Sequence, residues 1–225
     1  MSSSVNVLLL HPDPLVRAGI VACLRPHADL EVFEDGHDGV IPDAGSIAVV
    51  IADYHQALQL TTTADRAERG ALAMASILVL TSNDREADVR RALEAGVQGY
   101  LLLGGPLSEL IEAVTALAHG GRHLCRSIAQ RMVESLTRAS LTAREMDVLQ
   151  HVAAGESNKS IARQLQIEVG TVKSHMNAIL GKLKATSRTQ AAAIALTRGL
   201  VEHRPVSPWT FSPGVPSVEV AMQLI

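Results

Sequence analysis

The chain has 225 residues, of which 47% are hydrophobic and only 2% are aromatic. So few aromatic side chains nearly exclude a stacking platform for single-stranded nucleic acid. Cys23 and Cys125 cannot form a zinc cluster or a disulfide framework, and no apolar run approaches the length of a membrane span. We therefore expect a soluble, cytoplasmic protein of a reducing compartment that has no membrane partner.

The net charge of −3 is unevenly distributed. Residues 1–121 contain 7 Lys and Arg against 16 Asp and Glu, a net charge of −9. Residues 122–225 contain 13 against 7, a net charge of +6, and they hold all four lysines. An acidic half joined to a basic half predicts two domains with different partners, the basic one meeting nucleic acid.

The first half alternates short apolar runs with helical patterns. The runs that predict strands lie at residues 5–10, 30–33, 47–52, 77–80 and 100–103. The amphipathic patterns that predict helices lie at residues 14–24, 84–95 and 106–118. This alternation is typical of a parallel sheet with helices on both faces, whose sites lie at the carboxyl ends of the strands. Residues 36–46 are too few and too rich in Pro and Gly for a full helix between the second and third strands.

The second half shows no strand pattern. Residues 122–140 predict a partly helical connector with an exposed Cys125. The four helices that follow are expected at Thr142–Ala153, Asn158–Leu165, Val169–Leu183 and Ser187–Arg198. Thr142 and Glu145 have the spacing of a capping box, and Ser187 is a suitable N-cap. The Pro-rich tail is expected to be irregular.

Two short helices joined by a tight turn, the second one basic, are the parts of a helix-turn-helix. Asn158–Leu165 would support Val169–Leu183, which would enter the major groove of duplex DNA. The buried stripe of this second helix consists of Val172, Met176, Ile179, Leu180 and Leu183. The polar side chains off that stripe, which suit base edges and phosphates, are Lys173, Ser174, Asn177 and Lys182.

The run NKSIA at 158–162 followed by TVKSH at 171–175 resembles the LuxR/NarL/FixJ type of DNA-binding domain, and the likeness extends over residues 141–195. The resemblance implies that Lys173, Ser174 and Asn177 face the bases. The phosphate contacts that it implies are Asn158, Lys159, Thr171 and Lys182, with His175 either touching a phosphate or packing. It also implies a homodimer through the last helix, with an apolar patch of Ala192, Ile194, Ala195 and Leu196. Gly181 departs from the family, which usually has a basic residue there.

Residues 5–121 resemble a response-regulator receiver, through PLVRAGI at 14–20, LTS at 80–82, EAGVQGYLL at 94–102 and SELIEAV at 108–114. In such domains an aspartate accepts a phosphoryl group beside Mg²⁺, and a lysine pairs with the product. The resemblance implies that Asp53 is the phospho-acceptor position and that Thr81 and Tyr100 are the switch hydroxyl and switch aromatic. The implied fold is an α/β, flavodoxin-like, five-stranded parallel sheet followed by an all-α, four-helix helix-turn-helix domain.

The charges of receiver chemistry are missing from the sequence. His11 and Pro12 stand at the acidic pair, Asp13 falls one position beyond it, and Leu103 stands at the lysine. No lysine precedes Lys159, so a different alignment does not supply one. We therefore expect that the receiver fold is kept, that its phosphorylation chemistry is lost, and that Asp53 is a silent phospho-acceptor position.

Several alternatives remain open on the sequence alone. The chain could be a conventional phosphorylation-activated response regulator, or its receiver-like pocket could bind a small-molecule ligand. A transition metal could bind among His11, Asp13, Asp53 and His55. A phosphatase of the haloacid dehalogenase type would need a second aspartate where His55 stands. An interaction protein that titrates a partner regulator is a third class, and the intact TVKSH helix argues against it.

The preferred interpretation is a transcription regulator of a two-component system, not an enzyme, with no metal and no cofactor. Its expected partners are double-stranded DNA, a second copy of the chain, and RNA polymerase or another regulator. The predicted organisation is a degenerate receiver-like domain at 1–121, a linker at 122–139, a DNA-binding domain at 140–201 and a tail at 202–225.

Overall fold

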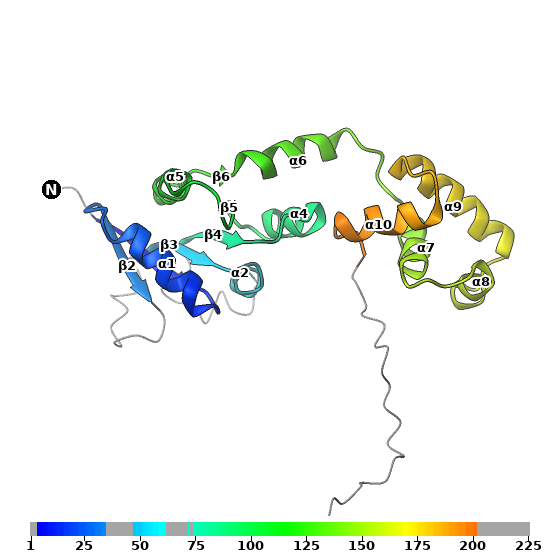
Figure 1. The fold of residues 1–225 in the computed structure, drawn as a ribbon, viewed down its shortest axis with the longest axis horizontal. Coiled ribbons are helices and arrows are strands. Elements are labelled where there is room, and N and C mark those ends of the chain that lie inside the picture. Colours follow the sequence, from blue (N-terminus) through cyan, green and yellow to red (C-terminus); the bar gives the residue numbers. More distant parts are fainter. Residues whose placement is uncertain (1–3, 35–46, 62–71, 73, 202–225) are drawn as a thin grey trace, which may run out of the picture.

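The computed structural model describes residues 4–34, 47–61, 72 and 74–201 (Figure 1). A parallel sheet with its helices comes first, and four helices follow. The expectations for residues 36–46 and for the tail lie outside the described residues.

The sheet has six strands in the order β2-β1-β3-β4-β5-β6, and every pair is parallel. The strands are β1 (Val5–Leu10), β2 (Leu30–Glu34), β3 (Ile47–Ala52), β4 (Ser76–Thr81), β5 (Gly99–Leu102) and β6 (His123–Leu124). The five predicted strands and the flavodoxin-like order are confirmed. The order reverses between β1 and β3, which is where such sheets place their sites.

The sixth strand corrects two predictions about the connector. His123 N–H donates to the Gln98 carbonyl at 3.1 Å and Cys125 N–H donates to the Tyr100 carbonyl at 3.0 Å, so β6 extends the sheet beyond β5. The second half therefore does contain a strand. With only two residues, this strand is too short to show a periodic pattern in the sequence. The expectation of an exposed Cys125 is also wrong, because the residue is 4% exposed within the core of the sheet.

Apolar strands and amphipathic helices form the core of this first domain. The helices are α1 (Pro14–Leu24), α2 (Tyr54–Thr61), α4 (Glu86–Glu94), α5 (Leu107–Ala118) and α6 (Arg126–Leu136). The central runs of β1, β3 and β4 are buried, as expected for parallel strands covered on both faces. Ile128 of α6 is fully buried in the same core, so the connector helix packs on the sheet.

The second domain consists of α7 (Ala143–Ala153), α8 (Asn158–Leu165), α9 (Val169–Leu183) and α10 (Arg188–Thr197). These four helices agree with the prediction to within a residue at each end. The capping box of Thr142 and Glu145 is confirmed, and Ser187 caps α10 by accepting the Gln190 N–H at 3.1 Å. The domain has its own hydrophobic core, which includes Leu149 and Ile161.

The two domains touch through the end of α10. Figure 1 shows α6 running from the sheet toward the second domain and α10 lying between α4 and α7. The Ala87 N–H of α4 donates to the Arg198 carbonyl at 3.0 Å. Because no side chain caps α4, this carbonyl satisfies one of the free donors at the helix N-terminus. Gly199, at φ +70°, follows directly and lies against Arg85.

Candidate DNA-binding face and receiver edge

The outward face of α9 is fixed by the stripe that it buries. Val172, Met176, Ile179 and Leu183 are buried, whereas Leu180, expected with them, is only half-buried. Anchoring this stripe turns the opposite side of the helix outward, since residues three and four apart share a face. Lys173, Ser174 and Asn177 are all exposed on that opposite side.

The exposed polar groups of α9 are mostly uncommitted. The Ser174 hydroxyl donates to the Gly170 carbonyl at 3.2 Å, one turn back along the helix. Within the described part of the chain, the side chains of Lys173 and Asn177 have no hydrogen-bond or ion-pair partner. A cation in the first half of a helix and an amide near its middle, both pointing into solvent, can both reach base edges in a major groove.

The predicted phosphate contacts divide into two groups. Lys159 and Thr171 are exposed, whereas His175 is half-buried. Asn158 already accepts a hydrogen bond from the Arg188 guanidinium, with 3.0 Å between Oδ1 and Nη1. Lys182 lies 2.6 Å from Glu145, measured from Nζ to Oε2. Asn158 and Lys182 therefore have partners within the domain, which sequence reasoning missed.

Glu145 joins α7 to α9. Its Oε2 accepts the Thr142 N–H at 2.7 Å and the Lys182 ammonium, although the residue is only 5% exposed. Burial raises the pKa of the Glu145 carboxyl, but the hydrogen bonds from Lys182 and Thr142 outweigh it and hold the pKa below its ordinary value. The carboxylate is therefore a structural anion that fixes α7 against α9.

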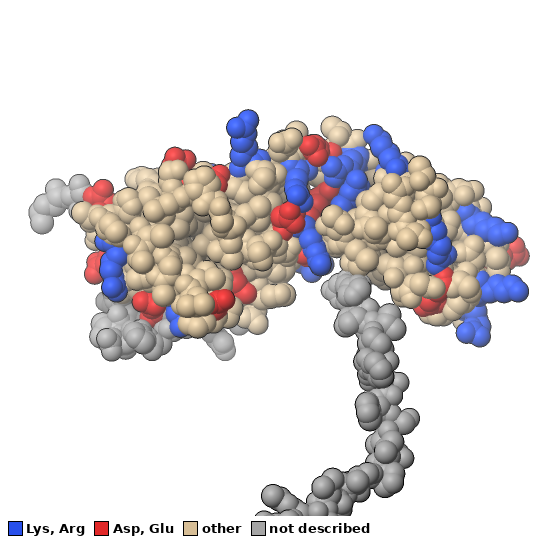
Figure 2. Space-filling model, in the orientation of Figure 1, with Lys and Arg blue, Asp and Glu red and all other residues tan. Residues whose placement is uncertain are grey.

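Figure 2 shows Lys and Arg side chains projecting from the end of the second domain where Figure 1 places α8 and the start of α9. The exposed cations of these two helices are Lys159, Arg163 and Lys173. Cations spread over one end of a domain form the footprint that attracts phosphates.

The dimer patch predicted on α10 needs a correction. Ala195 is fully buried and belongs to the core of the helical domain, so it is not available to a second copy. The other predicted members are Ala192, Ile194 and Leu196, which are half-buried. Thr189 and Ala193 are exposed one turn apart and mark the face of α10 that stays open.

Sheet register brings the predicted receiver residues to one edge. Leu10 pairs with Ala52, so His11 and Asp53 follow neighbouring strands. Thr81 pairs with Leu102, and the Leu103 N–H donates to the Thr81 carbonyl at 2.9 Å. His11 is 7% exposed, Asp53 is half-buried and Leu103 is 38% exposed. The carboxyl ends of four strands therefore meet as expected.

The polar groups of this edge are used locally. Asp53 accepts the Gln56 N–H at 2.7 Å and so caps α2. The Thr81 hydroxyl oxygen accepts the Asn83 N–H at 3.2 Å. Asp13 caps α1 by accepting the Leu15 N–H at 2.8 Å. His11 accepts the Asp13 N–H through Nδ1 at 3.1 Å.

These residues do not fit a magnesium ion, which prefers several carboxylate and water oxygens. An imidazole and a proline stand where two carboxylates would be needed, and Asp13 is turned to the start of α1. Across the described ranges, no three His, Cys, Asp or Glu side chains are grouped closely enough to hold a metal ion.

A hydrogen-bonded chain beside Asp53 was missed from the sequence. The Tyr54 hydroxyl donates to Asp88 Oδ1 at 3.2 Å, and Asn83 donates to Asp88 Oδ2 at 3.0 Å. The hydroxyl of Tyr100 donates to the Asn83 carbonyl at 2.7 Å. Burial raises the pKa of both tyrosines, with the Asp88 charge adding to it. Tyr100, the implied switch aromatic, is therefore held inside the fold.

An apolar cavity of about 270 Å³ lies beside Leu103, between α1 and the start of α5. Val16, Ile20, Leu101 and Leu110 contribute to its walls. Cys23 is half-buried and lines the same cavity. The leucine at the lysine position thus borders an apolar space.

A receiver-like sheet joined to a helix-turn-helix with an open recognition face defines a DNA-binding transcriptional response regulator. The family model for bacterial regulatory proteins of the luxR family matches residues 139–195. The transcriptional regulatory protein LiaR of Bacillus subtilis (strain 168) is 32% identical over 209 residues, covering 88% of this chain and 99% of LiaR. A nitrate/nitrite response regulator homolog of Haemophilus influenzae is 34% identical over 202 residues, covering 86% and 97%.

Two solved structures of RcsB have the same fold. The chain is 20% identical to a Salmonella typhimurium RcsB structure with a TM-score of 0.64, covering 84% of this chain and 98% of RcsB. It is 21% identical to RcsB in an RcsB–DNA complex with a TM-score of 0.61, covering 85% and 98%. The chain belongs to the LuxR/NarL family of response regulators, which are transcriptional regulators and not enzymes. None of the described helices could span a membrane.

Proposed function

We propose that this response regulator binds specific duplex DNA as a homodimer and does so without aspartyl phosphorylation. The observation that carries the proposal is the contrast between the two sites. The cation and amide of α9 are free and exposed, while the receiver edge has one carboxylate at its acceptor position and no lysine or acidic pair around it.

The receiver half of the proposal rests on charge. Phosphoryl transfer depends on cations placed where negative charge develops and where it remains on the product. Leu103 supplies no cation, His11 is buried and bonded to its own turn, and Asp53 already holds the start of α2. Asp53 then acts as a helix cap, and control falls to expression level or to a partner such as RNA polymerase or another regulator.

The DNA-binding half assigns roles to single residues. Lys173, Ser174 and Asn177 read base edges, while Lys159 and Thr171 contact phosphates. The remaining positions help to hold the helices in place; they are Asn158, His175 and Lys182. They also contact phosphates to the extent that their partners within the domain leave them free. A homodimer with two-fold symmetry requires inverted half-sites about one helical turn apart. RcsB is described as dimers bound to DNA, which supports this arrangement.

The proposed organisation keeps a receiver-like domain at 1–121, a linker at 122–139, a DNA-binding domain at 140–201 and a tail at 202–225. Part of the linker, including Cys125 and Ile128, is packed on the sheet. The linker therefore works as an extension of the receiver rather than as a free tether.

A binding map of the purified protein across genomic DNA, followed by operator titrations with and without acetyl phosphate, tests the proposal. We expect defined sites with two-fold symmetry and one affinity in both conditions. Binding that requires the phosphodonor would instead assign the chain to conventional, phosphorylation-activated regulators. Capture of a regulator protein without DNA binding would contradict the whole proposal.

The apolar cavity beside Leu103 favours a second candidate, a regulator whose receiver-like domain binds a small apolar ligand. Its volume of about 270 Å³ lies just below the usual range for ligand pockets, which restricts the ligand to a small molecule. Leu103→Lys would place a cation in that wall and abolish such binding. A screen of apolar probes by thermal shift, in wild type and in this variant, separates this candidate from the first.

A further inference from the structure

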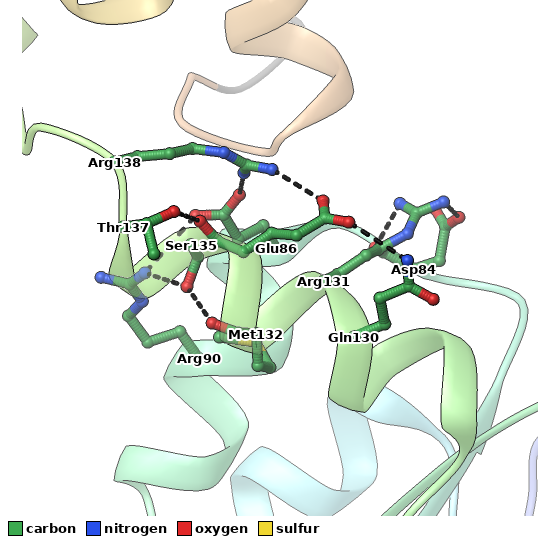
Figure 3. A network of polar contacts seen from close by, with 10 residues as sticks. Asp84, Glu86, Arg90, Gln130, Arg131, Met132, Ser135, Thr137 and Arg138 are labelled. Carbon is green, nitrogen blue, oxygen red and sulfur yellow. Dashed lines mark hydrogen bonds and ion pairs between the residues drawn. The ribbon is translucent and has the colours of Figure 1, made fainter.

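The polar network between α4 and α6 is closed on itself. Figure 3 shows Arg131 of α6 paired with Asp84, which lies just before α4, with 2.7 Å between Nη2 and Oδ2. Arg138, which lies just after α6, pairs with both Glu86 and Glu134. Each of these guanidinium groups therefore has its counter-charge within the network, which holds the connector against the receiver.

A second network lies at the start of α8 and is built differently. Arg188, the first residue of α10, donates to the Glu156 carbonyl in the turn before α8. It also donates to the Asn158 side chain, with 3.0 Å between Nη1 and Oδ1. In the described ranges, no carboxylate lies within ion-pair distance of this half-buried guanidinium. Arg188 therefore acts on α8 through hydrogen bonds to two uncharged oxygens.

This contact fixes the direction in which the Asn158 amide faces. A guanidinium only donates hydrogen bonds, so the amide atom that meets Arg188 must be the oxygen. The two N–H donors of the amide then lie on the other side of its carbon. No group of the described chain accepts them, and the nitrogen is not among the buried polar atoms without a partner, so solvent reaches it. The next residue, Lys159, is exposed.

The turn that precedes Asn158 is also held from the side of α7. The Glu156 carboxylate lies 3.0 Å from His151 of α7, measured from Oε1 to Nδ1. Its other oxygen accepts the Ser160 hydroxyl at 2.8 Å. With Arg188 on its carbonyl, Glu156 is thus fixed by α7, α8 and α10 together. A segment that is fixed before binding loses little conformational freedom when it meets a partner.

We propose that Arg188 is a positioning residue for DNA binding, which turns the Asn158 amide outward so that its N–H donates to a DNA phosphate. This role rests on the proposed DNA-binding function and on the phosphate contact expected at Asn158. Amide side chains are among the groups that bind phosphate oxygens and so set the register of a protein on the duplex. Without Arg188 the amide can rotate and present its oxygen, which a phosphate repels.

A double-variant cycle on operator affinity tests whether Arg188 acts through Asn158. Arg188→Met and Asn158→Ala should each weaken operator binding by roughly three- to tenfold, the effect of one net hydrogen bond. Because both variants remove the same phosphate contact, the double variant should bind no more than twofold weaker than Asn158→Ala alone. Arg126→Met removes an exposed cation outside the helical domain and should bind as wild type.

The salt dependence of operator binding separates positioning from direct contact. Lys159→Met, which removes an expected phosphate cation, should lower the slope of log affinity against log salt by about 0.9. An amide releases no counterion, so Asn158→Ala should keep the wild-type slope, and Arg188→Met should keep it too. A slope lowered in Arg188→Met as in Lys159→Met, or fully additive losses in the double variant, would show that Arg188 touches the DNA itself and would overturn the proposal.

Asn158→Asp distinguishes the outward donor from a merely structural contact, and it also decides the matter if Arg188→Met unfolds early. Aspartate keeps an oxygen on Arg188, so thermal unfolding should occur at the wild-type temperature or above. It presents an oxygen to the phosphate in place of the N–H, so operator binding should weaken more than in Asn158→Ala. Wild-type affinity in Asn158→Asp would overturn the positioning role. Lys173→Ala would still weaken operator binding in that case, which leaves the proposed function intact.

Discussion

The outward face of α9 and the carboxyl edge of the sheet both carry polar residues, but they use them differently. On α9 the Lys173 ammonium and the Asn177 amide point into solvent with no partner in the described chain. At the sheet edge Asp13, Asp53 and Thr81 each accept a hydrogen bond from backbone close by. A surface that reads an external partner leaves its hydrogen-bond donors free. A sheet edge that lacks the charges of receiver chemistry uses its polar groups to cap nearby backbone instead.

Substitution of Lys173 should have the largest effect on function. Lys173→Ala should weaken operator binding by about 1–3 kcal/mol if the ammonium reads a base edge. Log affinity should fall with log salt by roughly 0.9 per phosphate neutralised. Titration of labelled operator at several salt concentrations measures both. Arg122→Ala, which removes an exposed cation from the receiver side, is the control and should bind as wild type. Equal binding by both variants would contradict the assignment of α9.

A charge on the open face of α10 should act on the dimer. In Ala193→Glu, two-fold symmetry would bring like charges together at the proposed interface, so operator affinity should fall tenfold or more, about 1.4 kcal/mol. Ala193 is exposed, so the fold should survive, whereas Ala195→Glu would place a charge in the core. Sedimentation of the protein–operator complex measures the stoichiometry. One wild-type chain bound to a single half-site would exclude the dimer.

Neutralising Glu145 should affect stability. Glu145→Gln should lower the free energy of unfolding of the helical domain by about 1–3 kcal/mol at pH 7, because Lys182 loses its ion pair. The folded carboxyl has a lowered pKa, so its contribution is present above the ordinary value of about 4.3 and is lost as the pH falls through the lowered one. Urea unfolding measured at pH 7 and near pH 3, about four units apart, should show a smaller stability difference between Glu145→Gln and wild type at the lower pH. Asp147→Asn, at an exposed ion pair, should change stability by less than about 0.5 kcal/mol.

Removing the Tyr54 hydroxyl should have a smaller effect on the receiver. Tyr54→Phe loses the hydrogen bond to Asp88 and should cost about 0.5–1.5 kcal/mol of unfolding free energy. Operator affinity should stay at the wild-type value, since α9 lies in the other domain. Thr115→Val, which removes an exposed hydroxyl on α5, is the matched control and should change stability by less than about 0.5 kcal/mol. A large loss of operator affinity in Tyr54→Phe would show that the hydrogen bonds between Tyr54, Asp88 and Asn83 in the receiver domain control α9.

Much of the architecture was predictable because it depends on periodic patterns. The strands β1 and β3 are continuous apolar runs, and the helices of the second domain have capping residues that mark their ends. The strand β6 was not predictable, because two residues joined by backbone hydrogen bonds carry no pattern. Cys125 was misjudged for the same reason, since its burial depends on that pairing.

The sites were predictable in their residues but not in their partners. Motifs placed Lys173 and Asn177 on the face that the structure exposes. Pairings between distant segments, such as Glu145 with Lys182 and Tyr54 with Asp88, left no mark in the spacing of residues. Ala195 looked like part of a surface patch because small residues suit both a core and a helix contact, and only packing distinguishes them.

The most direct test of the central claim is operator affinity of wild type and Asp53→Asn, each with and without acetyl phosphate and Mg²⁺. Asparagine keeps the oxygen that caps α2 but cannot accept a phosphoryl group, so it separates the structural role of Asp53 from the chemical one. All four affinities should agree within about 0.5 kcal/mol, the range of a substitution that removes no functional contact. A stoichiometric phosphoryl mass increase in wild type, with tighter operator binding that Asp53→Asn abolishes, would contradict the account.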